Sequence, residues 1–446
     1  MPCPHSNRQD SDDREAGGGL SRRQMIRAAV AIGGAGGLSA CLDREGNATE
    51  TPESGTHPTG PEDLSTLPDR QHAWVEWLVR DRFGNTVLPQ HQAILLLDYV
   101  GPDPPDEGAR TAVESAFRTL ERAFQRGTGG DTSAVQHEGL LFVVGYSPSY
   151  FSRFEPSLPE SVTLPTPEAV LDELGETDAS ADNADAVVHL ASGLGSILLA
   201  AEEALFGDLE RINGVTVEGT LKEYFEISQR RTGFFGRAQP AQKYDSENIP
   251  EKAPLSMGFK SSYTDTLATE DRVTIRNGPF SGGTTMQVSR LEHDLEPWYE
   301  HDHEGRVHRM YSPEHDPDTV GEVGENLATD SGMTEGIAER VTEDAREKNV
   351  VGHGQKLLHA RDEDFRQPIL RRDFNATEAP GLHFDSWQRD LGDFLDVRKA
   401  MNGEHVAADV PDENDGILEF VTVTNRATFL MPPRSYRALP VPQPER

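Results

Sequence analysis

The chain has 446 residues, which is enough for two domains with sizeable cores. Its 42 lysines and arginines, of which seven are lysine, stand against 76 aspartates and glutamates and give a formal net charge of −34. This composition argues against nucleic-acid binding, because no basic stripe is present to neutralise phosphates. An acidic surface that favours arginine over lysine suits concentrated salt, where charges are heavily screened, and it predicts a halophilic source. An ordinary acidic mesophilic protein is the alternative.

Residues 1–41 are typical of an export signal. SRRQMIR at 21–27 carries paired arginines, and the glycine-rich apolar run at 28–41 is far shorter than the roughly 20 residues that span a bilayer. The pattern predicts a twin-arginine signal. LSAC at 38–41 is similar to a lipobox, which predicts cleavage before Cys41 and a lipid on its sulfur. A chance cysteine after a small-residue cleavage site is the alternative.

This signal predicts a location at the outer face of the cytoplasmic membrane of a halophilic archaeon, with contact to the membrane through the lipid anchor only. Cys3 lies in the removed segment, so the mature chain is expected to keep one cysteine and no internal disulfide. Residues 42–75 are rich in Pro, Gly, Ser, Thr and acids and show no apolar period. They predict a disordered acidic tether.

Past the tether the chain alternates strand-like and helix-like runs in two successive units. In the first unit strands are predicted at 92–100, 139–147 and 186–192, and helices through Val113, Phe117, Leu120 and Phe124 and at 193–206. In the second unit we predict strands at 284–295 and 381–388, a helix through Ile337, Val341 and Ala345, and a hairpin of 417–423 with 427–431. The alternation predicts an α+β protein with two similar domains, 76–240 and 241–446.

Histidines are the remaining candidates for chemistry. The sequence has no GxSxG, P-loop, GxGxxG or CxxC motif, and one mature cysteine excludes thiolate metal sites. One group mixes four imidazoles with carboxylates, a mixture that can bind zinc or copper: His301, His303, His308 and His315. Its spacing fits no closed motif, so a solvated loop is the alternative.

The second candidate is HARDEDFRQPILRR at 359–372. A neutral imidazole can ligate haem iron, and an arginine can stabilise charge that develops when the O–O bond of a peroxide breaks. His359 and Arg371 have the side chains for these two roles. Taken alone, a histidine such as His359 is more often an exposed or hydrogen-bonded residue than a metal ligand.

The motifs around this stretch resemble those of the dye-decolourising (DyP-type) peroxidases between about residues 86 and 435. The resemblance rests on the order of GFKSS (258–262), HDLEPW (293–298), HAR (359–361), ILRR (369–372), GLHF with WQRDL (381–391) and TFLMPP (428–433). It implies two ferredoxin-like domains, with haem b held mainly in the second. It further implies His359 as the ligand of the haem iron, Arg371 as the catalytic arginine, and Gly258 and Phe259 beside the cofactor.

The resemblance also implies hydrogen peroxide as the oxidant and an organic reductant of unknown identity. It leaves the oligomeric state open, a homo-oligomer included. One departure concerns the catalytic site itself. The family has an aspartate where this chain has Ser261, and a hydroxyl is a poor proton acceptor, so we expect weak peroxidase activity. Asp265 lies nearby in the sequence as a substitute.

Two other functions remain open at this stage. One is a haem-binding or haem-iron handling protein without peroxidase turnover. The other is a haem-free metal-binding or structural protein, with the histidines of 301–315 as the metal site.

Overall fold

The computed structural model describes residues 56–159, 161–236 and 248–443. The predicted signal, Cys41 and the first part of the predicted tether lie outside these residues. The chain divides into residues 1–45 and 46–446, and the described residues all belong to the second unit. No helix in the described ranges is long and apolar enough to cross a membrane.

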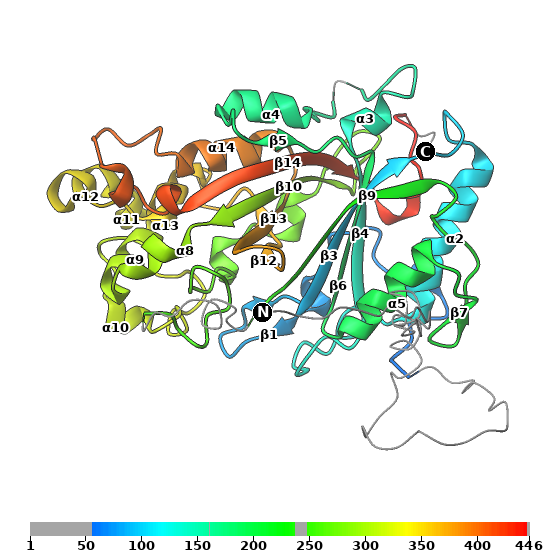
Figure 1. Cartoon of the computed structure of the whole chain (residues 1–446), viewed down its shortest axis with the longest axis horizontal. Coiled ribbons are helices and arrows are strands. Elements are labelled where there is room, and N and C mark those ends of the chain that lie inside the picture. Colours follow the sequence, from blue (N-terminus) through cyan, green and yellow to red (C-terminus); the bar gives the residue numbers. More distant parts are fainter. Residues whose placement is uncertain (1–55, 160, 237–247, 444–446) are drawn as a thin grey trace, which may run out of the picture. The chain divides into compact units, whose positions relative to one another are not determined.

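The secondary structure mixes strands and helices throughout (Figure 1). The strands are β1 Val79–Arg80, β2 Thr86–Val87, β3 His91–Tyr99, β4 Leu140–Tyr146, β5 Ser180–Ala181, β6 Ala186–Ser192, β7 Arg211–Ile212, β8 Val215–Thr216, β9 Phe225–Phe234, β10 Thr284–His293, β11 Leu370–Arg371, β12 Phe374–Ala376, β13 Gly381–Gln388 and β14 Val421–Met431. The helices are α2 Glu107–Ala123, α3 Pro148–Phe151, α4 Pro167–Leu174, α5 Gly195–Phe206, α7 Glu270–Val273, α8 Leu295–Glu300, α9 His303–Met310, α10 Pro317–Val320, α11 Glu335–Glu339, α12 Val341–Lys348, α13 His353–Leu357 and α14 Leu391–Met401.

Both halves of the sheet have the strand order of a ferredoxin-like unit, as the resemblance implied. In the N-terminal half, neighbouring strands pair antiparallel in the order β9-β3-β6-β4, and α2 and α5 follow β3 and β6 in the chain. In the C-terminal half the order is β14-β10-β13-β12, with α14 before the last strand. When the four strands of each half are numbered in chain order, both halves have the order 4-1-3-2, which is the arrangement of split βαβ units. The α+β fold predicted from the sequence is confirmed.

The two halves join edge to edge at both ends. β4 pairs with β14 at Tyr146 and Leu430, and β9 pairs with β12 at Gly233–Phe234. Together with the pairings inside each half, these joints close the eight strands into a ring, so neither half has a free sheet edge there. The predicted domain boundary at residue 240 falls within 237–247, outside the described residues, and stays a prediction.

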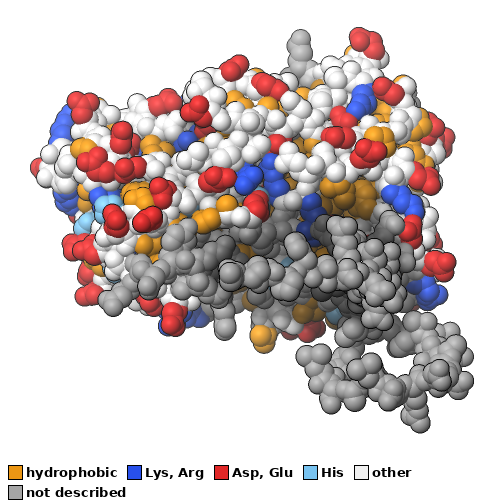
Figure 2. Space-filling model, viewed as in Figure 1, with side chains coloured by type: hydrophobic (Ala, Val, Ile, Leu, Met, Phe, Trp, Pro, Cys, Tyr) orange, Lys and Arg blue, Asp and Glu red, His pale blue; other side chains and the backbone are white. Residues whose placement is uncertain are grey.

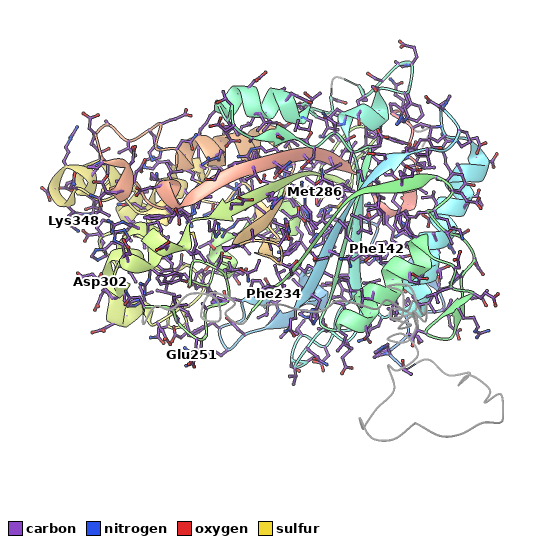
Figure 3. The ribbon with its side chains drawn as sticks, viewed as in Figure 1. Phe142, Phe234, Glu251, Met286, Asp302 and Lys348 are labelled. Carbon is purple, nitrogen blue, oxygen red and sulfur yellow. The ribbon has the colours of Figure 1, made fainter. Side chains whose placement is uncertain are left out.

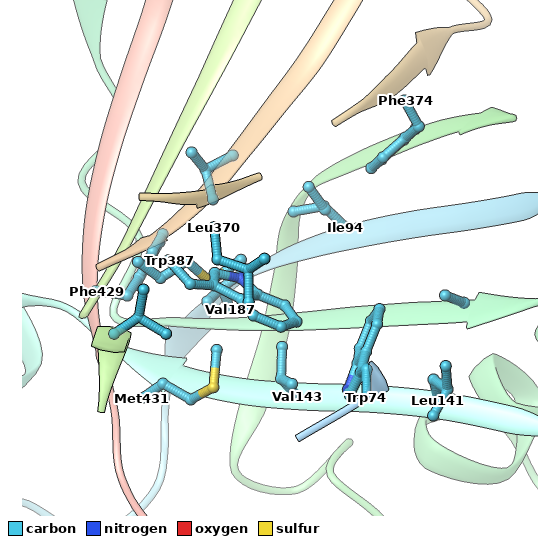
Figure 4. Close-up of a cluster of buried hydrophobic side chains, with 14 of the residues drawn as sticks. Trp74, Ile94, Leu141, Val143, Val187, Leu370, Phe374, Trp387, Phe429 and Met431 are labelled. Carbon is cyan, nitrogen blue, oxygen red and sulfur yellow. The ribbon is translucent and has the colours of Figure 1, made fainter. Parts of the chain in front are cut away.

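The main core fills the inside of this ring (Figure 4). Ile94 and Val143 of the N-terminal half meet Phe429 and Trp387 of the C-terminal half in one buried cluster. Trp74 joins them and meets Trp387 edge to face, with ring centroids 4.9 Å apart. Because each strand alternates its side chains between two faces, the opposite face of the C-terminal strands is left for a second layer.

Trp74 also corrects the predicted tether. Its side chain is fully buried, and the backbone N–H of Gly60 donates to the carbonyl of Arg122 on α2 at 3.0 Å. Residues 56–75 are therefore part of the folded unit, and this part of the tether prediction is wrong. Composition did not reveal it, because a few buried anchors are enough to fix a polar segment.

One element prediction in the second half was also wrong, and another was confirmed in part. The expected hairpin is one strand, β14, which pairs with β10 over its whole length apart from one bulge at Arg290–Leu291. Polar Asn425 and Arg426 interrupt the apolar run but do not turn the chain, because both stay paired with β10, at Arg290 and Ser289. The expected helix through Ile337 and Ala345 is split at Arg340 into α11 and α12.

The described surface matches the acidic composition. Carboxylate side chains are spread over the visible face in Figure 2. The segment 294–369, which contains α8 to α13, connects β10 to β11. Figure 3 places its residues Asp302 and Lys348 at the end of the view opposite Phe142 of β4. This helical segment covers the outer side of the C-terminal strands, and the candidate site lies under it.

Candidate functional site

A large cavity lies between the helical segment and the outer face of the C-terminal strands. It has a volume of about 210 Å³ for the centres of water-sized molecules, far above the roughly 10–15 Å³ that one buried water needs. Its walls come from β10, β13, β14 and α14 on one side and from α9, α13 and the 258–263 loop on the other. Most of the wall is apolar, including Met257, Leu291, Met310, Leu357, Phe384 and Phe394.

The segment 369–374 delivers polar groups to this cavity by strand alternation. Ile369, Arg371 and Asp373 line the cavity, whereas Leu370 and Phe374 belong to the core inside the ring. This is the period of two expected for an extended chain between two buried layers. A one-residue shift would exchange the two sets, so the pairing of Arg371 with Ser386 on β13 fixes which groups face the cavity.

The structure brings Arg371 and Ser261 together. The Arg371 Nη2 donates to the backbone carbonyl of Ser261 at 2.9 Å, and both residues line the cavity. Phe259 also lines it and is buried. Gly258 forms the preceding turn with φ +93°, where a side chain would be strained and its Cβ would lie 3.2 Å from the Tyr299 hydroxyl. Gly258 therefore shapes the loop rather than lining the cavity.

The cavity is cationic although the chain is acidic. Five cations line it: Lys260, Arg361, Arg371, Arg398 and Arg426. Lys260 is paired with Asp81, and Arg398 and Arg426 share Glu176. Among the described residues Arg361 and Arg371 form no ion pair, so two guanidinium groups at the cavity wall keep their charge available for an anionic ligand.

The predicted ligand His359 lies outside the cavity. Its imidazole is exposed, donates through Nε2 to the Ala338 carbonyl at 3.1 Å, and stacks on His405 with ring centroids 3.8 Å apart. It sits in a 3-10 turn, Leu358–Ala360, beyond the end of α13. The structure thus brings Arg371 and Ser261 to one place and leaves His359 on the surface.

Two other histidines line the cavity, and both are held in the neutral form. Burial, followed by the charges of Lys356, Arg371 and Arg398, lowers the pKa of His353 to about 3. Burial lowers the pKa of His293 to about 4. The neutral imidazole is the form that binds a metal ion, so neither group would need to lose a proton first.

The two imidazoles differ in whether their Nδ1 atoms already have a hydrogen-bond partner. His293 Nδ1 lies 2.6 Å from the Ser256 hydroxyl. His353 Nδ1 is buried and has no hydrogen-bond partner among the described residues. An unsatisfied buried nitrogen costs about 1–3 kcal/mol, and such a group calls for a ligand or another explanation. His353 is therefore the better candidate for binding a ligand in the cavity.

The His301–His315 group does not converge on one point. His301 packs against Phe420, His303 stacks on Phe259, and His315 hydrogen-bonds Ser312 and the Ser331 carbonyl. Within the described ranges no set of three or more potential ligands could hold a metal ion. Asp265, the predicted substitute for the missing aspartate, is exposed and does not line the cavity.

The sequence did contain signals for the residues that were missed. His353 and Leu357 are four residues apart on α13 and both face the cavity, a helical period that His359 does not share. Asp373 is two residues from Arg371 in an extended segment and so faces the same way. The resemblance favoured HAR at 359–361, whereas the helical period that His353 shares with Leu357 favours His353.

Residues 89–433 match a protein family described as a family of unknown function, DUF7405. The chain belongs to this family. No curated protein matches the DUF7405 chain in sequence. Its fold does match solved structures, among them ferric DtpA from Streptomyces lividans, with a TM-score of 0.51 and 15% identity over 81% of this chain and 95% of that one.

Dye-decolourising peroxidases are among the other structural matches. The DyP-type peroxidase from Cellulomonas bogoriensis gives a TM-score of 0.49 and 18% identity over 81% of this chain and 96% of that one. A variant of DypB from Rhodococcus jostii, in complex with haem, gives 0.47 and 17% over 79% and 96%. At these identities the likeness to DtpA establishes the fold alone, and the chemistry has to be argued from this DUF7405 chain's own residues.

Proposed function

We propose that the protein is a haem-binding peroxidase of the DyP type, which uses hydrogen peroxide to oxidise a reductant. The observation that carries the proposal is the composition of the cavity wall. The wall combines a large apolar surface with the neutral imidazole of His353 and the guanidinium groups of Arg361 and Arg371. Within the described part of the chain, one nitrogen of His353 has no hydrogen-bond partner and neither guanidinium forms an ion pair. The iron state named for DtpA and the haem named for DypB agree with this choice.

The residues present fit haem. Its flat apolar ring requires apolar walls, its two carboxylates require cations, and its iron requires an axial ligand such as imidazole. We propose His353 rather than His359 as that ligand, because His359 is exposed and outside the cavity. Haem, when bound, supplies the iron redox chemistry of peroxide reduction.

The chain's own groups would prepare the peroxide for reaction. Arg371 is held at the cavity wall by the Ser261 carbonyl and keeps its positive charge without a carboxylate partner. A fixed guanidinium can donate hydrogen bonds to an oxygen on which negative charge develops. This interaction stabilises the charge more strongly in apolar surroundings than in water. The apolar walls exclude water and so strengthen this interaction.

The Arg371→Leu variant tests this role. We expect it to bind haem but to react with hydrogen peroxide about 10²- to 10³-fold more slowly, the loss typical for removal of one charge-stabilising donor. Stopped-flow absorption in multimolar salt measures the rate, and Arg361→Leu is the matched control for losing a cavity cation. An unchanged rate in Arg371→Leu would remove Arg371 from the mechanism.

Haem handling without turnover is the second candidate function, favoured by the serine at 261. A haem-loaded parent protein whose spectrum does not respond to peroxide would support it. A protein that takes up no haem at all would overturn both functions and return attention to a haem-free role.

For the region outside the described residues, we propose twin-arginine export and a lipid anchor on Cys41, on the basis of the motifs at 21–41. The Cys41→Ser variant should be released from membranes, because a lipid on its sulfur would be the only attachment. Replacement of Arg22 and Arg23 by lysine should retain the precursor in the cytoplasm. Fractionation followed by immunoblotting measures both, and unchanged membrane association of Cys41→Ser would contradict the anchor.

A further inference from the structure

We infer that Asp373 is the acid–base group of this site and takes the place of the carboxylate that Ser261 does not supply. The inference rests on the proposed peroxidase function and adds the residue that moves the proton. Asp373 is the only carboxylate among the described residues that line the cavity, and its side chain is buried, with 5% exposure.

The position of Asp373 follows from strand geometry. It is two residues after Arg371, and alternate residues of an extended chain point to the same face, about 7 Å apart along the strand. Leu370 and Phe374 are held in the core inside the ring, which prevents this segment from rotating its polar groups away from the cavity. The charge-stabilising group and the carboxylate are therefore delivered by one segment.

The alternatives within reach of the site are poorer bases. Ser261 already uses its carbonyl to hold Arg371, and its hydroxyl is a far weaker proton acceptor than a carboxylate. Asp265 is exposed and outside the cavity. His353 is the proposed ligand of the iron, and His293 Nδ1 already lies 2.6 Å from the Ser256 hydroxyl, so both imidazoles are engaged in other contacts. This leaves Asp373 to accept and return the proton.

The proposed step moves one proton between the two oxygens of hydrogen peroxide. The Asp373 carboxylate takes a proton from one oxygen of hydrogen peroxide and gives it to the other oxygen, which then carries two hydrogens. The O–O bond breaks with its electron pair on that second oxygen, which leaves as water. Haem, when bound, would supply the two electrons that this step requires, and Asp373 would be a carboxylate again at its end.

The Asp373→Asn variant is the direct test, because asparagine has nearly the same shape and no basic oxygen. In the haem-loaded protein we expect reaction with peroxide to slow by at least about 100-fold, within the range for a lost acid–base group, with haem content unchanged. Ser261→Asp added to Asp373→Asn should raise the rate of that variant by at least about tenfold. If Asp373→Asn were slow because its structure is damaged, a carboxylate at position 261 would not restore the rate.

Cyanide gives a second readout that does not depend on turnover. Hydrogen cyanide must lose its proton to bind iron as the anion, so a base in the cavity speeds its association. Asp373→Asn should slow cyanide association at neutral pH, while Asp265→Asn, which removes an exposed carboxylate outside the cavity, should leave the rate of cyanide association unchanged. If Asp373→Asn reacts with peroxide and with cyanide as fast as the parent does, the inference is overturned. The proposed function would remain intact.

Two further results separate the remaining cases. If Asp373→Asn does not fold, Asp373→Glu keeps the carboxylate but displaces it by about one bond, which should slow the peroxide reaction about tenfold to 100-fold. An unchanged rate in that variant overturns the inference. A parent protein that takes up no haem overturns the proposed function, and the absorption spectrum reveals this before peroxide is added.

Discussion

The His353→Ala variant is expected to lose at least about 100-fold in haem affinity. Loss of an outer hydrogen-bond partner of a metal ligand typically costs 10- to 100-fold, and loss of the ligand itself should cost at least the upper end. His353 lines the cavity, has an unsatisfied buried nitrogen, and is kept neutral because burial and neighbouring cations lower its pKa to about 3. Titration of purified protein with haem in high salt, followed by absorption, measures the affinity.

Two histidine variants control this experiment. His359→Ala should leave haem affinity and spectrum unchanged, because its ring lies outside the cavity, against His405 and the Ala338 carbonyl. His293→Ala tests the rival ligand, the cavity histidine that already contacts Ser256. Haem loss in His293→Ala together with full binding in His353→Ala would move the ligand from α13 to β10 and refute the assignment.

The sequence allowed the fold to be predicted further than the site. Buried strands such as β3, β4 and β6 appear as unbroken apolar runs, and α2 appears through the spacing of Val113, Phe117 and Leu120. These signals are local, so the sequence alone carries them. The closure of the ring could not be predicted in this way, because Tyr146 and Leu430 meet across almost 300 positions of the chain.

The site depends on such distant contacts as well. Arg371 and Ser261 were singled out because both lie in motifs whose order resembles that of a known family, and the structure places both at one cavity wall. His353 and His359 differ by six residues, and only the end of α13 after Leu357 decides which imidazole turns inward. The same limit applies to the predicted tether, because the sequence does not reveal that Trp74 packs against the distant Trp387.

A buried charge cluster joins the C-terminal segment to α2. Glu121 is 6% exposed and accepts hydrogen bonds from Arg434 at 2.7 and 2.9 Å and from Arg437 at 2.5 and 3.0 Å. Arg437 is also bound by Glu114, whose side chain is 31% exposed. One carboxylate thus satisfies two guanidinium groups, and removing its charge would leave them without their main partner.

The Glu121→Gln variant is expected to lose about 3–5 kcal/mol of unfolding free energy, the cost of breaking a buried ion pair by removing one partner. The matched control, Glu114→Gln, should lose at most about 1 kcal/mol, because that pair is partly exposed. Urea unfolding of parent and variants at pH 7, at one fixed salt concentration, measures both. Equal losses in the two variants would show that burial does not set the strength of this cluster.

The same variant should show a defined pH dependence. Burial raises the pKa of Glu121, but the charge of Arg437 and the hydrogen bonds from both arginines outweigh it and lower the pKa from 4.5 to about 2. Because the folded-state pKa lies below that of the unfolded chain, Glu121 stabilises the fold fully above pH of about 4.5 and loses this effect as the pH falls toward 2. The difference in unfolding free energy between parent and Glu121→Gln should therefore be constant from pH 7 to about pH 5 and shrink at lower pH. A difference that stays constant down to pH 3 would mean that Glu121 acts through packing alone, and not through its charge.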